Sequence, residues 1–218
     1  MAYDWIGHWK NNNIGFHLPN VNPLFEQYWP KLTISKTGSI LVPLCGKTLD
    51  LAWLAHHGYY VIGVELSDIA CEAFFIENVI PFKTQKLAEF TRYYSTHIEL
   101  YCGDFFALCS AMLPPISAVY DRAALIALPY NLRQDYARHL TNLLPDNAEM
   151  LIITYDSPNA VKGPPYSVSN TEINALYGKH FHIEQLAHFL QNAAPKHLQA
   201  KGYEELYEAV YRLRKIVD

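Results

Sequence analysis

The chain has 218 residues, of which 50% are hydrophobic and 14% aromatic, and its 17 basic and 21 acidic residues give a formal net charge of −4 at pH 7. This size predicts one domain with a sizeable core, and the scattered basic residues argue against a nucleic-acid binder. The amino terminus lacks the charged and apolar regions of a signal peptide, and no apolar run approaches the roughly 20 residues of a membrane span. We therefore expect a cytoplasmic protein without nucleic-acid or membrane partners.

Cysteine and histidine spacing gives no metal or disulfide pattern. The four cysteines have no C-x-x-C spacing, so we expect reduced and mostly buried thiols. Among ten histidines there is no H-E-x-x-H motif. His180 and His182 would share one face of a strand and could bind a metal, but solvated or core histidines are commoner. We predict no metal. The cysteines are Cys45, Cys71, Cys102 and Cys109.

The amino-terminal segment, residues 1–35, is rich in aromatic side chains. Trp5, Trp9 and Phe16 lie near three consecutive asparagines and lack the periodicity of a core helix. We interpret the segment as a lid that closes over bound ligands, with aromatic faces available to a cation or a flat ring. Packing on a sheet is the alternative, most of all for Trp5.

The sequence pattern of residues 40–65 predicts a strand, a turn, a helix and a second strand. The apolar run from Ile40 to Leu44 enters a turn at Gly46, a helix is predicted from Thr48 to His57, and a second apolar run ends at Glu65. In doubly wound α/β folds an acidic residue about 20 positions after the glycine turn binds the ribose hydroxyls of a nucleotide. The spacing of Gly46 and Glu65 fits that layout, although an ordinary turn followed by an exposed glutamate has the same pattern.

The number of glycines in the turn predicts which class of cofactor binds. A pyrophosphate needs several backbone amides at a helix amino terminus, and dinucleotide sites therefore carry three glycines. This turn has only Gly46, and Pro43 removes an amide donor nearby. A nucleoside cofactor without phosphates fits better, and S-adenosylmethionine is the common one.

The remaining elements alternate along the chain. A helix capped by Ser67 should run to about Asn78, and a long connector containing Pro81 follows. The later predicted elements are strand 98–102, strand 116–120, helix 132–144, strand 149–154, a helix opening at Thr171, and strands 182–190 and 206–213.

The last two predicted strands have no helix predicted between them, which indicates an antiparallel hairpin. The predicted fold class is α/β, a Rossmann-like methyltransferase fold with a mostly parallel central sheet, helices on both faces and an antiparallel carboxy-terminal hairpin.

From about Trp5 to Leu213 the chain resembles the bacterial members of the thiopurine S-methyltransferase family. The motifs occur in the family's order, which makes the resemblance specific. The matching segments are Trp9 with Ile14-Gly-Phe-His17, Val42-Pro-Leu-Cys-Gly-Lys47, Gly63-Val-Glu-Leu-Ser67, Gly103-Asp-Phe-Phe106, Tyr120-Asp-Arg-Ala-Ala-Leu125 and Gly163-Pro-Pro-Tyr-Ser167.

The resemblance implies a cytosolic, monomeric enzyme with one domain over 1–218, in which 36–218 form the core. Its activity would be in-line transfer of the methyl group of S-adenosylmethionine to the sulfur of thiopurines and other aromatic or heterocyclic thiols. Bacterial relatives are also associated with methylation and detoxification of selenium and tellurium compounds, so the natural acceptor stays open.

The resemblance also implies site residues. The cofactor contacts are Trp5, Trp9, Leu44, Gly46, Glu65, Gly103, Asp104, Phe105 and Arg122, and the substrate contacts are Trp9, Phe16 and Arg122.

The chemistry of the residue types agrees with these roles. Glu65 can accept both ribose hydroxyls, and Asp104 can accept from the adenine amino group or cap the helix that follows it. Arg122 can orient a thiolate or the cofactor carboxylate, and a surface ion pair with Asp121 is the alternative. No obligatory acid or base is predicted, because the sulfonium methyl is already activated.

Some positions depart from the family pattern. Tyr166 stands where phenylalanine is usual, and Lys196, His197 and Lys201 stand where arginine is expected near the substrate. Two other classes of protein remain as alternatives. The single-glycine turn disfavours a dinucleotide-dependent oxidoreductase, and the intact Trp9, Phe16 and Arg122 argue against a non-catalytic cofactor-binding module.

Overall fold

A computed structural model describes residues 3–159, 162–191 and 194–217. The chain forms two compact units, Met1–Glu26 with Ser35–Val119, and Gln27–Ile34 with Tyr120–Asp218. Strand β6 (Ile116–Arg122) begins in the first unit and ends in the second. The single-domain organisation with a lid at 1–35 stays a prediction.

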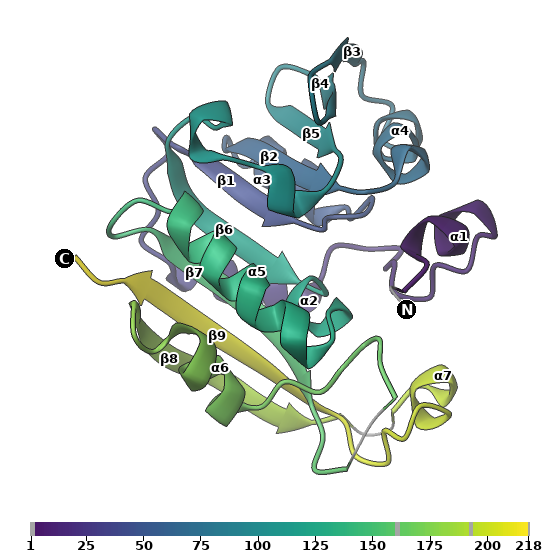
Figure 1. The fold of residues 1–218 in the computed structure, drawn as a ribbon, viewed down its shortest axis with the longest axis vertical. Helices are drawn as coiled ribbons and strands as arrows, with labels where there is room; N and C mark the ends of the chain where they lie inside the picture. Colours follow the sequence, from purple (N-terminus) through teal and green to yellow (C-terminus); the bar gives the residue numbers. More distant parts are fainter. Residues whose placement is uncertain (1–2, 160–161, 192–193, 218) are drawn as a thin grey trace. The chain divides into compact units, whose positions relative to one another are not determined.

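The first unit is built on parallel strands whose order is β5-β2-β1-β6, with the pair β3-β4 at the β5 edge (Figure 1). The parallel strands are almost wholly buried, as expected for apolar runs covered on both faces. They place the site residues at their carboxyl ends. The strands are β1 (Ser39–Pro43), β2 (Tyr60–Glu65), β3 (Lys83–Lys86), β4 (Thr91–Tyr94) and β5 (Ile98–Cys102).

Helices α3 and α4 of the first unit follow the predicted pattern, whereas α1 and α2 were not predicted. Ser67 caps α4 by accepting a hydrogen bond from the Ala70 amide, which confirms its predicted role. The short helix α1 was not predicted, and Asp4 caps it by accepting from the Gly7 amide. The helices are α1 (Trp5–Lys10), α2 (Pro23–Tyr28, which continues into the second unit), α3 (Asp50–His56) and α4 (Asp68–Glu77), with 3-10 turns η2 (Phe105–Ala107) and η3 (Ser110–Met112).

The connector expected after α4 contains an antiparallel hairpin instead. Strand β3 pairs with β4, and β4 pairs antiparallel with β5. All four residues of β3 are exposed, so the segment offers no apolar alternation from which a strand could be predicted.

In the second unit the strand order continues from β6 as β7-β9-β8, and β9 pairs antiparallel with both neighbours. Figure 1 shows α5 and α6 along this part of the sheet. The elements are β7 (Glu149–Asp156), β8 (Phe181–Leu190), β9 (Tyr207–Lys215), α5 (Tyr130–Leu143), α6 (Asn170–Tyr177), α7 (Lys196–Gln199), and 3-10 turns η1 (Trp29–Lys31) and η4 (Leu125–Ala127).

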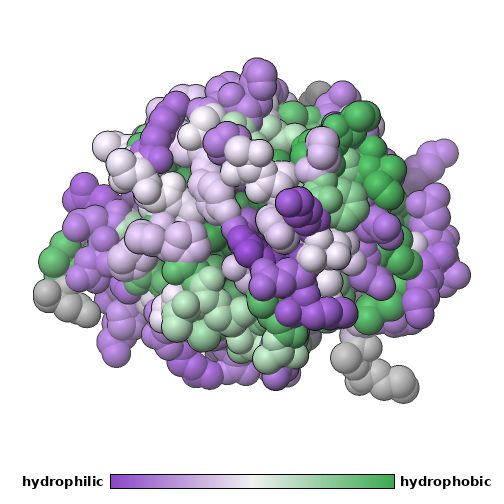
Figure 2. All heavy atoms as spheres, turned by 90° about the horizontal axis from the view of Figure 1, so that it is seen from above, coloured by the Kyte–Doolittle hydropathy of each residue, from purple (hydrophilic) through white to green (hydrophobic). Residues whose placement is uncertain are grey.

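The fold class is the predicted one: α/β, with a mostly parallel central sheet and an antiparallel carboxy-terminal hairpin. The expectation that no helix separates the last two strands is wrong, because the one-turn helix α7 lies between β8 and β9. Through the described ranges, no helix has the length and apolar character needed to cross a membrane. Figure 2 shows hydrophobic residues lying among hydrophilic ones on one face of the molecule.

Candidate functional site

The turn after β1 has an unusual backbone. Leu44 has a φ of +47° and Gly46 a φ of +55°, so two left-handed residues flank Cys45. A non-glycine residue in this region carries local strain, which is common at ligand sites. A side chain at Gly46 would also approach the Trp9 ring, since an added Cβ would lie 3.3 Å from Cζ2. Leu44 and Gly46 therefore form a tight turn that lies against Trp9.

The Glu65 side chain is hydrogen-bonded to this turn. Its Oε2 accepts a hydrogen bond from the Gly46 amide at 2.8 Å, and its Oε1 accepts one from the Ser67 amide at 2.8 Å. Burial raises the pKa of Glu65, while the hydrogen bonds from the backbone amides of Ser67, Gly46 and Leu66 oppose that rise. Each carboxylate oxygen has two lone pairs, so both can accept a further hydrogen bond while held in place.

Hydrogen bonding within the turn bears on the cofactor class. The Cys45 amide donates to the Val64 carbonyl at 2.9 Å, and the Gly46 amide donates to Glu65. These amides are therefore engaged inside the protein, whereas a pyrophosphate site needs several of them aimed at the ligand. The donor set suits a nucleoside whose hydroxyls bind a carboxylate.

The end of β5 adjoins Glu65. The Gly103 amide donates to the Glu65 carbonyl at 2.9 Å. A Cβ at Gly103 would lie 2.5 Å from a ring carbon of Phe90 and 2.7 Å from the Glu89 carbonyl oxygen, so this glycine is required by packing. Asp104 is exposed, and its Oδ1 accepts from the Phe106 amide at 3.0 Å, which makes it the cap of η2.

Phe105 is buried directly after this cap. The capping alternative for Asp104 is thus present in the structure, and it uses the Oδ1 atom of the carboxylate. Asp104 can serve as a cap through one oxygen and accept from a ligand through the other.

The predicted lid aromatics lie together. The Phe16 ring makes edge-to-face contacts with Trp5 and with Trp9, each with 5.5 Å between ring centroids. Trp9 is buried, while Trp5 and Phe16 are partly exposed. Helix α1 carries the two tryptophans, so these side chains form one cluster that contacts the Gly46 turn through Trp9. Its mobility stays a prediction.

Two of the four cysteines lie at strand ends, Cys45 after β1 and Cys102 at the end of β5. The thiols were expected to be mostly buried; Cys45 and Cys71 are buried, whereas Cys102 is half-buried and Cys109 is exposed. Burial raises the pKa of Cys45, and the Glu65 charge raises it further. Throughout the ranges that the structure describes, no group of three or more His, Cys, Asp or Glu side chains could hold a metal ion.

Arg122 ends β6 in the second unit. Its neighbour Asp121 is fully buried, accepting from the Tyr136 hydroxyl at 2.7 Å and from the Leu125 amide at 3.1 Å. Burial raises the pKa of Asp121 to about 6. The alternative of a surface Asp121–Arg122 pair is wrong, because Asp121 faces the core. Ala123 follows with a φ of +63°, another left-handed non-glycine residue beside a candidate site residue.

Lys201, one of the departures from the family pattern, holds the Gly163–Tyr166 segment. Its ammonium group donates to the Pro164 carbonyl, and the Tyr203 hydroxyl donates to the Pro165 carbonyl at 3.2 Å. Burial lowers the pKa of Lys201. Lys196 and His197 lie exposed in α7.

Sequence reasoning missed Tyr155 and Glu208. The charge of Arg122 lowers the pKa of Tyr155 and of Glu208, against the rise that burial causes in each. No local pattern marks either residue, since each lies within a strand and the two become partners only when β7 pairs with β9.

Known proteins resemble this chain over nearly its whole length. Residues 1–216 match the family model described as thiopurine S-methyltransferase. A thiopurine S-methyltransferase of Pseudomonas fluorescens (strain SBW25) is 44% identical over 211 residues, covering 96% of each chain. One of Nitrosospira multiformis is 41% identical over 210 residues, again covering 96% of each chain.

Among solved structures, the Burkholderia thailandensis 1,6-didemethyltoxoflavin-N1-methyltransferase with bound 1,6-didemethyltoxoflavin and S-adenosylhomocysteine has a TM-score of 0.67 at 14% identity, covering 98% of this chain and 86% of that chain. A Methanosarcina mazei S-adenosylmethionine-dependent methyltransferase has a TM-score of 0.64 at 13% identity, with 91% and 100% covered. These likenesses show the shared fold. With the family match and the relatives above, they establish that the chain belongs to the thiopurine S-methyltransferase family and is an S-adenosylmethionine-dependent methyltransferase.

Proposed function

We propose that the enzyme methylates the sulfur of thiopurines and other aromatic or heterocyclic thiols. The names of its relatives support this acceptor class. The observation that carries the cofactor half of the proposal is the Glu65 carboxylate, fixed by the Gly46 and Ser67 amides at the end of β2. When bound, S-adenosylmethionine supplies an activated sulfonium methyl that the acceptor sulfur takes by in-line displacement.

In this proposal the first unit binds the cofactor. Glu65 accepts the two ribose hydroxyls, and the free oxygen of Asp104 accepts from the adenine amino group beside Gly103 and Phe105. Leu44 and the Gly46 turn lie under the rest of the molecule. The cluster of Trp5, Trp9 and Phe16 is aromatic and partly exposed, which suits a sulfonium cation or a flat heterocycle.

Arg122 orients the acceptor in the same proposal. A thiol on an electron-poor ring loses its proton near neutral pH, so it needs a positive partner rather than a base. The planar guanidinium can hold the thiolate by charge-assisted hydrogen bonds. Positioning of this kind contributes up to roughly 7 to 11 kcal/mol for well-oriented partners.

The test is a methyl-transfer assay with 6-mercaptopurine, its oxygen analogue hypoxanthine, and selenite and tellurite in parallel. We expect S-methylated product from the thiol and none from hypoxanthine. Methyl transfer to the metalloid oxyanions without transfer to the thiol would show that the acceptor is a metalloid compound and not a thiol. Methylated product from hypoxanthine would show that the enzyme does not require a sulfur acceptor.

A further inference from the structure

The proline segment, residues 163–167 of the second unit, contains two consecutive prolines. Proline has no backbone N–H, so Pro164 and Pro165 cannot fix the chain by donating hydrogen bonds. Side chains from the connection between β8 and β9 hold their carbonyls instead. The Lys201 ammonium group donates to the Pro164 carbonyl, and the Tyr203 hydroxyl donates to the Pro165 carbonyl at 3.2 Å. The conformation of the segment at these two positions therefore depends on Lys201 and Tyr203.

The turn that carries these two donors is itself held in place. Gly202, between Lys201 and Tyr203, has a φ of +98°, a left-handed conformation that favours glycine. The Leu198 carbonyl accepts from the Lys201 amide at 2.9 Å and from the Tyr203 amide at 3.1 Å. Tyr203 is fully buried, and its ring packs edge-on against Tyr155. The two donors therefore reach successive carbonyls from a fixed backbone.

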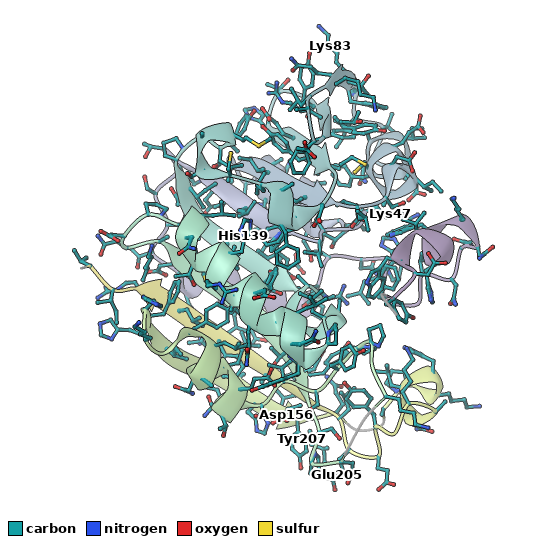
Figure 3. The ribbon with its side chains drawn as sticks, in the orientation of Figure 1. Lys47, Lys83, His139, Asp156, Glu205 and Tyr207 are labelled. Atoms are coloured by element: carbon teal, nitrogen blue, oxygen red, sulfur yellow. The ribbon has the colours of Figure 1, made fainter. Side chains whose placement is uncertain are left out.

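The rest of the proline segment is hydrogen-bonded to the ends of two neighbouring strands, β6 and β7. The Tyr166 amide donates to the Ile126 carbonyl at 2.7 Å, in the 3-10 turn η4 that follows β6. The Ser167 hydroxyl donates at 3.3 Å to Oδ1 of Asp156, the last residue of β7 (Figure 3). Ligands of open α/β sheets bind outside the carboxyl ends of the strands, so the segment lies where an acceptor is expected.

Tyr166 gives the proline segment an aromatic surface. A Cβ at Gly163 would lie 2.4 Å from the Tyr166 ring, so the ring folds back on the segment and requires the glycine. The Arg133 guanidinium lies 5.7 Å from the ring centroid and pairs with Glu172 at 2.6 Å. Tyr166 is half-buried, so part of its ring is accessible. An aromatic ring held in this way suits contact with a planar heterocycle.

We propose that Lys201 and Tyr203 are positioning residues that set acceptor specificity, because they hold the proline segment and its Tyr166 ring in one arrangement at the acceptor site. The inference rests on the proposed methyl transfer to heterocyclic thiols. A segment held at consecutive carbonyls presents one surface before the acceptor arrives, which favours acceptors large and flat enough to cover it. A bicyclic thiopurine therefore gains more from the segment than a single-ring thiol does.

The experiment compares a bicyclic with a single-ring acceptor, 6-mercaptopurine with 4-nitrothiophenol. Lys201→Met keeps the long stem and removes the donor, and Tyr203→Phe removes only the hydroxyl. Each should raise KM for 6-mercaptopurine about tenfold and KM for 4-nitrothiophenol less than about twofold. For both thiols, kcat should change less than about twofold, as should the calorimetric Kd for S-adenosylhomocysteine. Because Lys201 is half-buried, Lys201→Met decides the question if Tyr203→Phe fails to fold.

A conservative variant and two matched controls complete the set. Lys201→Arg restores a donor and should return KM for 6-mercaptopurine to within about threefold of the wild-type value. Lys179→Met, at an exposed lysine of the same unit, is the control for Lys201→Met. Tyr207→Phe is the control for Tyr203→Phe, since the Tyr207 hydroxyl donates to the exposed Glu205 at 3.2 Å (Figure 3). Both controls should leave the two KM values unchanged.

Three results would overturn the inference. Equal increases in KM for the two thiols, or losses equal to the unfolded fraction seen by thermal melting, would show that Lys201 and Tyr203 do not set specificity. Unchanged KM in both variants of an enzyme that methylates 6-mercaptopurine would remove the positioning role and leave the proposed function standing. No transfer to either thiol by the wild type would remove the proposed function, and this inference with it.

Discussion

At the scale of single residues, Glu65 shows how a site is built before its ligand arrives. Both carboxylate oxygens accept backbone amides, one from the β1 turn and one from the start of α4. The carboxylate is therefore oriented at no further entropic cost when hydroxyls bind. The sequence predicted Glu65 from its distance to Gly46, but the amide partners depend on the turn geometry and could not be predicted from spacing.

Glu65→Gln should weaken S-adenosylhomocysteine binding by at least about tenfold, because an amide NH2 must then face an N–H donor and a ribose hydroxyl loses a charged acceptor. Hydrogen bonds to charged groups contribute about 1.5 to 3 kcal/mol each. Calorimetric titration measures the change. Glu77→Gln, at an exposed carboxylate that pairs with Lys47, is the control, and equal affinities in the two variants would contradict the assignment.

Arg122→Lys should lower kcat/KM by at least tenfold, about 1.4 kcal/mol of transition-state stabilisation, since lysine keeps the charge but loses the planar fork. Thiols of low pKa should be affected most, because they reach the site as anions. Steady-state kinetics across a thiol series measures this. The control is Arg138→Lys, an exposed residue paired with Asp135. Unchanged kinetics would leave Arg122 outside the proposed mechanism.

At the scale of elements, the predicted helices and strands agree with the structure where the local sequence pattern is strong. The strand predicted at 98–102 coincides with β5, and α4 begins directly after its predicted cap. Both predictions rest on local features, an apolar run and a capping residue. The hairpin β3-β4 escaped prediction for the opposite reason. Lys83-Thr-Gln-Lys86 is wholly exposed, and its strand state depends on pairing with β4 rather than on its own residues.

The lid hypothesis is a prediction about α1. Lys10, at the end of this helix, is exposed, as is Lys83 in β3. If the segment closes over the cofactor, S-adenosylhomocysteine should slow tryptic cleavage after Lys10 several-fold and leave cleavage after Lys83 unchanged. Mass spectrometry of early digests gives both rates from one sample. Equal protection of both bonds, or of neither, would remove the lid.

At the scale of the whole molecule, composition and charge predicted the class of protein, and motif order predicted the family, which the comparisons confirm. Contacts across long stretches of chain were not predictable. Lys201 holds Pro164 from 37 positions away, and Arg133 binds Glu172 from 39 positions away. Such pairs form only after the sheet has brought the segments together.

The buried Asp121 predicts how global stability depends on pH. Its folded pKa is about 6 against an ordinary value of 3.8, so the folded state binds more protons between these values. Its contribution to the free energy of unfolding is therefore fully present below the lower value and falls as pH rises through about 6, by up to about 1.4 kcal/mol per pH unit.

Urea unfolding from pH 4 to pH 7 measures this contribution as the difference between wild type and Asp121→Asn. We expect the free energy of unfolding of the wild type, relative to that of Asp121→Asn, to fall as pH rises in that window. Asp135→Asn, at an exposed position, should show no such shift relative to wild type. Parallel pH curves for wild type and Asp121→Asn would assign the titration elsewhere.

The left-handed backbone at Leu44 and at Ala123 has a consequence for engineering. Replacing a left-handed residue by glycine removes about 1 to 2 kcal/mol of strain, and the larger entropy of the unfolded chain offsets only about 0.4 to 1 kcal/mol of this. A selection for heat resistance alone would therefore favour glycine at both positions, one in the cofactor turn and the other beside Arg122. Mutant libraries made to raise the thermal stability of this enzyme should keep these two codons fixed, or should be screened for turnover in every round.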